Sequence, residues 1–280
     1  MRKSSYIVLK SILNASQSFE RLAPFLDEEL LNKLASLEAP KAFSYKHFFS
    51  ENTLNNVHYS WLIPTLKNLK EDLSFCLASL PEKMRLKLNR QFNVENYPSE
   101  ITQNAKEYIH LIFLNSLLGD EDIILPIQYL EHSPINVLAS KTKKTLIQII
   151  DYLALFDLAK EIRKILNTST IKRIYSFLSE PEKTFLKRTQ SLNDPVSFSS
   201  LLEKWDGTEE SFRKILHKKG LYRFGLALCG AHSDLIWYVC HLLDIGRGAS
   251  LMKMCEKKVN PVISSTIQSH ILEILDMLKA

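Results

Sequence analysis

The side chains best suited to chemistry gather near the C-terminal end of the chain: Cys229, His232, Cys240, His241 and Cys255. Cys229 and His232 have a spacing that can bind zinc, because thiolate and imidazole are ligands that zinc prefers. Cys240 and His241 are adjacent, however, and adjacent side chains on a helix point about 100° apart and do not easily share a metal. Cys240 also lies in a strongly apolar stretch, where cysteine acts as a small hydrophobic residue. We therefore expect no metal site and no cofactor.

The sequence motifs of the common enzyme classes are missing from the chain. It has no phosphate-binding loop, no dinucleotide-binding glycine pattern, no GxSxG nucleophile elbow and no HExxH zinc helix. The acidic run at 27–29 lies at an expected helix start, where negative charge interacts favourably with the helix dipole. We predict that the protein is not an enzyme. The alternative, an unrecognised helical active site, would require a deep polar pocket with shifted pKa values.

The composition is typical of a globular helical protein. Hydrophobic residues make up 45% and charged residues 24% of the 280 residues, which argues against disorder. Only 7 glycines are present, whereas sheet proteins with many tight turns use glycine often. The four cysteines have no disulfide-framework spacing, and we find neither a signal sequence nor an apolar run long enough to cross a bilayer. We therefore expect free thiols and a cytoplasmic location.

Apolar residues recur at helical spacing in several stretches. The clearest is 263–278, which follows Asn260 and Pro261, a favourable N-cap and first helical residue. A second stripe runs over 146–165. The stretch 108–118 is apolar nearly all round, which predicts a central, buried helix. The predicted fold is all-α: an irregular multi-helix bundle with amphipathic helices around one large core, and little or no sheet.

Helix ends and breaks are also readable. Thr208 should cap a helix that ends at 218–220, where two lysines precede a glycine. Breaks are expected at 92–99, at 119–134 and at 192–200. The third break, rich in Asn, Asp, Pro and Ser, is the best candidate for a boundary. The predicted domains are therefore an N-terminal and central helical region, 1–195, and a C-terminal helical subdomain, 196–280.

One segment occurs twice, at 77–87 and again at 177–187, with matching Ser, Pro, Glu, Lys, Leu and Lys residues. In each copy a serine is followed three residues later by a glutamate, which is the pattern of a capping box. The repeated segment is compatible with a true duplication and with chance reuse of a good helix start. Either origin predicts a helix start in each copy.

The positive charge is unevenly distributed. Segment 141–188 holds eleven Lys or Arg against five Asp or Glu, a net charge of +6, while the whole chain carries +5. Such a segment could meet nucleic acid, anionic lipid or an acidic protein surface. A solvated helix surface of mixed charge is the simpler interpretation. A helical nucleic-acid-binding protein that uses 141–188 is the alternative to the function given below.

Residues 57–64, Val-His-Tyr-Ser-Trp-Leu-Ile-Pro, resemble the His-x-Ser-Trp-Leu segment near the N-terminus of the SctK (YscK-like) family of type III secretion proteins. Residues 224–251 are more weakly similar to a helical repeat of the flagellar switch protein FliG. The shared features are the Leu-Ala-x-x-Gly-Ala pattern at 226–231 and Arg247, which matches after one inserted residue. The charged helix by which FliG meets the stator has no counterpart, so a torque-generating role is not implied.

The resemblance to SctK implies a position in a cellular machine. That family links the cytosolic domain of the inner-membrane ring protein SctD to SctQ, the main protein of the sorting platform. We therefore expect a non-enzymatic adaptor at the inner face of the bacterial membrane that works through protein–protein contacts. Trp61 and Leu62 are the first candidates for partner binding, with His58 of the same motif and Arg247 beside them. A tryptophan that belongs to the core is the alternative interpretation of Trp61.

Overall fold

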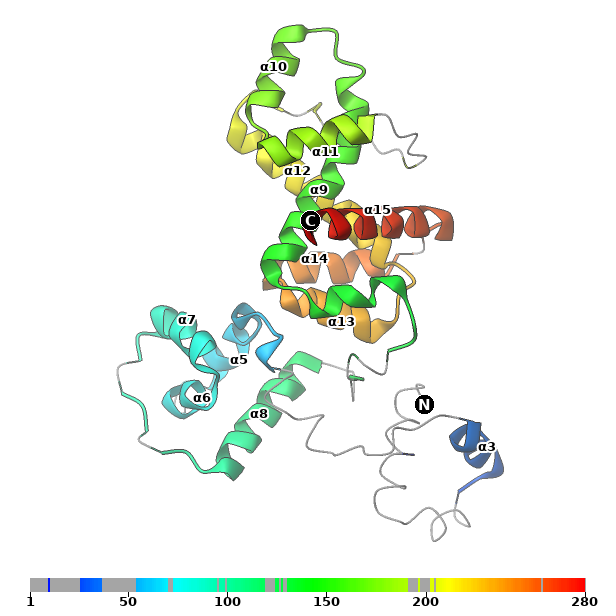
Figure 1. Cartoon of the computed structure of the whole chain (residues 1–280). Helices are drawn as coiled ribbons and strands as arrows, with labels where there is room; N and C mark the ends of the chain where they lie inside the picture. The colour runs from blue at the N-terminus through cyan, green and yellow to red at the C-terminus, as the bar shows by residue number, and fades with distance from the viewer. Residues whose placement is uncertain are drawn as a thin grey trace. The chain divides into compact units, whose positions relative to one another are not determined.

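Helices make up all the regular secondary structure in the described part of the chain (Figure 1). The computed structural model describes residues 10, 26–36, 54–69, 73–94, 96–98, 100–118, 124–125, 127, 130–190, 196, 202–203, 205–257 and 259–279. The predicted all-α class is confirmed for these residues, which contain no strand. Among them, none of the helices has the length and apolar character that a bilayer crossing requires.

The chain divides into two units, 1–130 and 131–280. The division falls in the second predicted break and not at the 195/196 boundary that the sequence favoured. The physical reason is that helices on both sides of 192–200 pack against each other. Val196, the one described residue of that break, is buried, and its carbonyl accepts hydrogen bonds from Arg223 and Lys160. Val196 is therefore tied to the core of the second unit.

The first unit contains α3 (Glu28–Ser36), the 3-10 turn η3 (Tyr59–Trp61), α5 (Ile63–Asn68), α6 (Leu73–Ser79), α7 (Glu82–Phe92) and α8 (Gln103–Leu118). The acidic run at 27–29 starts α3 as expected, because Asp27 Oδ1 accepts from Leu30 N–H at 2.7 Å. Helix α6 packs on α7 and α8, and η3 packs on α5 and α7.

Helix α8 is not the central buried helix that its apolar sequence predicts. It buries only one side, with His110, Phe113 and Leu114 inside, while Tyr108 is 66% exposed. His110 lies inside because its Nε2 is 2.8 Å from the carbonyl oxygen of Ser79. The helix that is buried nearly all round is α9 of the second unit, where every residue of 152–159 is buried.

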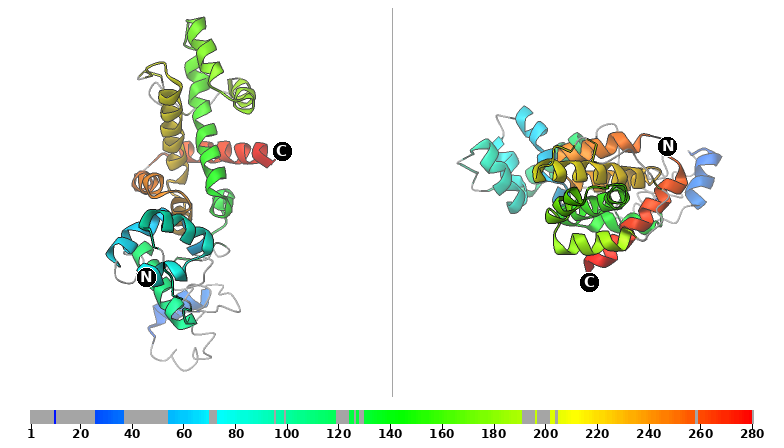
Figure 2. Two further views of the ribbon diagram at one scale, coloured as in Figure 1. Left: turned by 90° about the vertical axis from the view of Figure 1, so that its left-hand side faces the viewer. Right: turned by 90° about the horizontal axis from the view of Figure 1, so that it is seen from above.

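The second unit contains the 3-10 segment η6 (Pro134–Ser140), α9 (Lys143–Ile162), α10 (Thr168–Ser176), α11 (Glu180–Gln190), α12 (Glu209–Leu228), α13 (Ser233–Leu242), α14 (Ile245–Cys255) and α15 (Pro261–Lys279). Helices α11, α12 and α15 all pack against α9, and α14 packs against α12 and α13. Figure 2 shows α9 and α12 side by side, with α15 lying across them. The predicted C-terminal helix is confirmed, with Asn260 Oδ1 accepting from Val262 N–H at 2.9 Å.

Helix α12 starts at the predicted cap, since Thr208 accepts from Ser211 N–H at 3.2 Å, but it does not end at Gly220. It continues to Leu228, and Gly220 lies inside the helix against the backbone of α9. A Cβ at this position would lie 1.8 Å from the carbonyl oxygen of Ile150. The glycine therefore permits helix packing in place of ending the helix.

A buried ion pair joins the same two helices. Arg223 of α12 donates from Nε to Asp157 Oδ2 at 3.0 Å and from Nη2 to Asp157 Oδ1 at 2.9 Å. The arginine is completely buried and lies over the ring of Phe156. This two-point geometry offsets part of the cost of desolvating both charges.

Both copies of the repeated segment begin a helix, as predicted, but the caps differ. In the second copy Glu182 Oε2 accepts from Ser179 N–H at 2.7 Å, which is the glutamate half of a capping box. In the first copy the Ser79 hydroxyl donates instead to the Cys76 carbonyl, and Pro81 is the N-cap of α7 without a side-chain hydrogen bond. The shared sequence thus specifies the helix start but not one capping geometry.

Candidate partner-binding site

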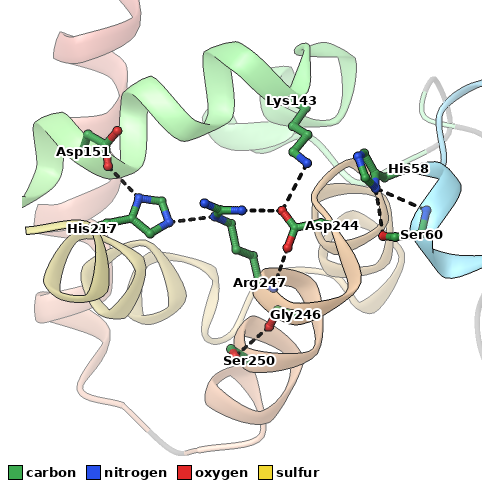
Figure 3. Close-up of polar contacts among 9 residues, drawn as sticks. All are labelled: His58, Ser60, Lys143, Asp151, His217, Asp244, Gly246, Arg247 and Ser250. Carbon is green, nitrogen blue, oxygen red and sulfur yellow. Dashed lines mark hydrogen bonds and ion pairs between the residues drawn. The ribbon is translucent and has the colours of Figure 1, made fainter. Parts of the chain in front are cut away.

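The segment that carries the resemblance to SctK folds into a short capped turn. His58 is the N-cap of η3: its Nδ1 accepts from Ser60 N–H at 3.3 Å and lies 2.8 Å from Ser60 Oγ (Figure 3). Helix α5 follows directly, with Pro64 in its first turn. The His and Ser of the motif therefore have a local structural purpose, since their two side chains close the turn that contains Trp61.

Trp61 and Leu62 lie in different environments. Leu62 is completely buried, as is Leu66 one turn later in α5, and Val57 on the other side of the turn is 4% exposed. Trp61 is only partly buried. Leu62 thus holds the turn onto the core of its unit, and Trp61 is the one of the two with surface that a partner could touch. Lys87 of α7 lies 5.4 Å from the centre of the Tyr59 ring and packs the turn from the side.

Arg247 lies in a chain of polar contacts that joins three helices of the second unit (Figure 3). From α14, its Nε donates to His217 Nε2 of α12 at 2.7 Å. His217 Nδ1 lies 2.7 Å from Asp151 Oδ1 of α9. On the other side, Arg247 pairs with Asp244, which also pairs with Lys143 of α9 at 3.2 Å. The guanidinium is therefore held within its own unit, with about a third of its side chain exposed (34%).

The geometry identifies the tautomer of His217. Arginine Nε carries a hydrogen at any physiological pH, so the His217 Nε2 facing it accepts. The proton of the neutral ring then lies on Nδ1 and is donated to Asp151. Both ring nitrogens are engaged, and the histidine acts as a bridge between the carboxylate of α9 and the guanidinium of α14.

Asp244 is the anionic centre of the network. Partial burial alone would raise its pKa, but hydrogen bonds from Arg247 and Lys143 outweigh that effect and lower the pKa to about 2. Its Oδ1 also accepts from Arg247 N–H at 3.3 Å, which caps α14. The carboxylate thus stays ionised at neutral pH and fixes the start of α14 against α9.

The sequence singled out Arg247 but none of its partners. His217, Asp151, Asp244 and Lys143 carry no motif, and His217 is 66 residues from Asp151. A faint signal does exist: Asp151 and Asp157 are six residues apart, as are their partners His217 and Arg223. Such matched spacing is meaningful only once two helices are known to lie side by side.

The cysteine and histidine residues near the C-terminus are distributed over the helix ends and the core. Among the described residues, no three His, Cys, Asp or Glu side chains converge as a metal site would require. His232 caps α13 by accepting from Asp234 N–H, and Cys240 is completely buried. His241 stacks on Trp237 with ring centres 4.0 Å apart and lies 2.8 Å from the Trp237 carbonyl oxygen. Burial lowers the His241 pKa to about 4, against the opposing effect of that hydrogen bond.

Several charges of the basic segment 141–188 are used inside the second unit. Lys143 pairs with Asp244, Arg188 pairs with Glu273 at 3.0 Å, and Lys160 donates to the Val196 carbonyl. At these three positions the cationic side chain is paired within the second unit, although Arg188 itself stays 64% exposed.

Comparisons with protein-family models, with curated proteins and with solved structures found no match for this chain.

Proposed function

We propose that this chain is a non-enzymatic adaptor of a type III secretion system. It would link the cytosolic domain of an SctD-like inner-membrane ring protein to an SctQ-like sorting-platform protein. The observation that supports the proposal is the turn at 58–62, where the residues shared with the SctK family have complementary structural roles. His58 and Ser60 close the turn, Leu62 holds it in the core, and the partly buried Trp61 keeps some exposed surface.

A turn of this kind is suited to present a binding residue. Tryptophan is enriched among the few residues that dominate binding energy, because it buries a large apolar area while losing little side-chain freedom. The turn is held by side-chain hydrogen bonds and by a buried leucine, so the indole is positioned before a partner arrives. Leu62 contributes through this positioning and not through direct contact.

The proposal is tested with the full chain, by co-purification and by biolayer interferometry against each of the two partners from the same genome, at low and at high salt. We expect a complex with at least one partner. Trp61→Ala should weaken it at least about thirtyfold, as truncation of a central interface tryptophan does. His58→Ala should weaken it less, because it loosens the turn without removing the indole.

Tyr108→Ala is the matched control, since Tyr108 is an aromatic residue of the same unit that is 66% exposed on a different helix. The affinity of the Tyr108→Ala variant for each partner should stay within about twofold of that of the wild-type chain. Circular dichroism establishes that every variant is folded. Absence of a complex with either partner at low salt, or a folded Trp61→Ala variant that binds both partners normally, would overturn the proposal. In the first case, fluorescence anisotropy with labelled DNA and RNA tests the nucleic-acid alternative directly.

A further inference from the structure

Two thiols at the ends of α12 and α14 meet at one carbonyl oxygen. Cys229, the C-cap of α12, donates its Sγ–H to Gly225 O at 3.3 Å. Cys255, the last residue of α14, reaches the same oxygen at 3.9 Å. Cys229 Sγ also lies 3.4 Å from the carbonyl oxygen of Met254, the residue before Cys255. A pair of thiols this close needs only a short movement of the sulfur atoms to become covalently linked.

The backbones of α12 and α14 are close for a reason visible in the sequence. Gly225, one helical turn before Cys229, packs against Met254, the neighbour of Cys255. A Cβ on Gly225 would lie 2.8 Å from Met254 Sδ and 3.1 Å from Met254 Cβ. The missing side chain brings the two helix ends together, and a disulfide requires such a close backbone approach.

The two thiols differ in access. Cys229 is 7% exposed, whereas Cys255 is only partly buried, so an oxidant from solvent reaches Cys255 first. Cys240 of α13 is a third thiol in this region, and burial together with Cys255 raises its pKa. It is completely buried in the core. The resolving thiol is therefore Cys229, which shares an acceptor with Cys255.

We propose that Cys229 and Cys255 are an oxidative modification site that closes to a disulfide in the presence of a peroxide. The Cys255 thiolate attacks one peroxide oxygen, the O–O bond breaks, and a sulfenic acid and one water form. The Cys229 sulfur then attacks the sulfenic sulfur and releases a second water. In total, two thiols and one hydrogen peroxide give one disulfide and two waters. This inference does not depend on the proposed function.

The surroundings make this pair slow to react at neutral pH. Burial, assisted by the neighbouring Cys229, raises the pKa of Cys255 to about 12, and burial also raises the pKa of Cys229. The thiolate is the nucleophile, so the initial rate of oxidation follows the thiolate fraction of Cys255. Both rise about tenfold for each pH unit between 7 and 9. Brief exposure to a peroxide leaves the pair reduced and sustained exposure closes it. Once closed, the bond encloses α13 and fastens the end of α14 to α12.

The test uses the full, reduced chain, treated with hydrogen peroxide, blocked with N-ethylmaleimide and digested with trypsin without reduction. We expect mass spectrometry to find peptide 224–247, which contains Cys229 and Cys240, linked to peptide 254–257, which contains Cys255. Fragmentation of the linked species distinguishes Cys229 from Cys240. The amount formed in a fixed short time should increase about tenfold from pH 7 to pH 8.

Cys240→Ser and Cys76→Ser are the matched controls, and both should retain the link, while Cys229→Ser should abolish it. If a variant does not fold, the linked peptides from the wild-type chain still decide the proposal. Absence of the linked peptides after prolonged oxidation, a link to Cys240, or a link that survives in Cys229→Ser would overturn the proposal.

Discussion

Arg247 and His217 are joined by a 2.7 Å hydrogen bond in which the arginine Nε–H donates to the histidine Nε2. The bond connects α14 to α12, and the other ring nitrogen of His217 extends the connection to Asp151 of α9. Three helices that are distant in sequence are thereby connected through one imidazole. The hydrogen bond requires Nε2 to be the ring nitrogen without a proton, because two N–H groups cannot hydrogen-bond to each other.

Nitrogen-15 NMR of the imidazole tests the assigned tautomer. In the neutral ring of His217 the proton should lie on Nδ1, and observation of the Nε2–H tautomer would contradict the geometry. Arg247→Met should lower the free energy of unfolding by about 1 kcal/mol, because it removes charged hydrogen bonds that are partly shielded from water. Arg188→Met, at an ion pair whose arginine is 64% exposed, is the control and should cost less than about 0.5 kcal/mol.

Gly220→Ala is expected to be severely destabilising. The new Cβ would lie 1.8 Å from the Ile150 carbonyl oxygen, and α9 and α12 would have to separate. We expect a loss of about 3 kcal/mol or more in urea unfolding, at the upper end of overpacking effects. Gly246→Ala is the control: its Cβ would meet only Asp244 Oδ1 at an ordinary 3.6 Å, so stability should be unchanged or rise by up to about 1 kcal/mol. Equal effects of the two substitutions would show that the close approach is unimportant.

Asp157→Ala should also be costly, because it leaves the guanidinium of Arg223 buried without its carboxylate. Breaking a buried pair in this way costs about 3–5 kcal/mol. The double variant Asp157→Leu with Arg223→Met replaces both charges by apolar groups and should recover most of that loss. Denaturant unfolding of the single and double variants measures both effects. A double variant that is less stable than Asp157→Ala would contradict this account.

An exposed pair provides the baseline for that comparison. Asp276 pairs with Lys279 near the end of α15, where the two side chains are 76% and 64% exposed. Asp276→Ala should change stability by less than about 0.5 kcal/mol, since surface ion pairs are largely screened by water.

His241 should make folding stability depend on pH. Burial lowers its pKa to about 4 in the folded state, below the ordinary value of 6.5. As the pH falls below about 6.5, the unfolded chain takes up the proton first, so stability decreases progressively down to about pH 4. The full difference is about 3 kcal/mol. Above about pH 7.5 the histidine is almost fully neutral in both states and contributes little pH dependence.

Urea unfolding of the wild type and of His241→Phe between pH 7 and pH 4.5 measures this contribution. Phenylalanine preserves an aromatic ring against Trp237 but cannot take up a proton. The variant should lose less stability than the wild type over this interval. Parallel pH curves for the two proteins would show that His241 is not the responsible group.

The sequence by itself determined the local features of this protein. The all-α class follows from helical periodicity and scarce glycine, and the starts of α12 and α15 follow from Thr208 and Asn260. These features were predictable because a cap is made between residues two or three positions apart, within the reach of a single side chain. The turn at 58–61 is local in the same sense, since its side-chain hydrogen bonds join His58 to Ser60.

Only the tertiary structure decided the features that depend on which helices are neighbours. Gly220 has the sequence signature of a helix end, yet it is the contact that lets α12 pass close to Ile150. The break at 192–200 has the composition of a linker, yet Val196 is bound by side chains of α9 and α12. Arg247 was recognisable as a candidate, but its partner His217 was not. The physical reason is that burial and ion pairing depend on distance in space, which a pattern along one helix does not contain.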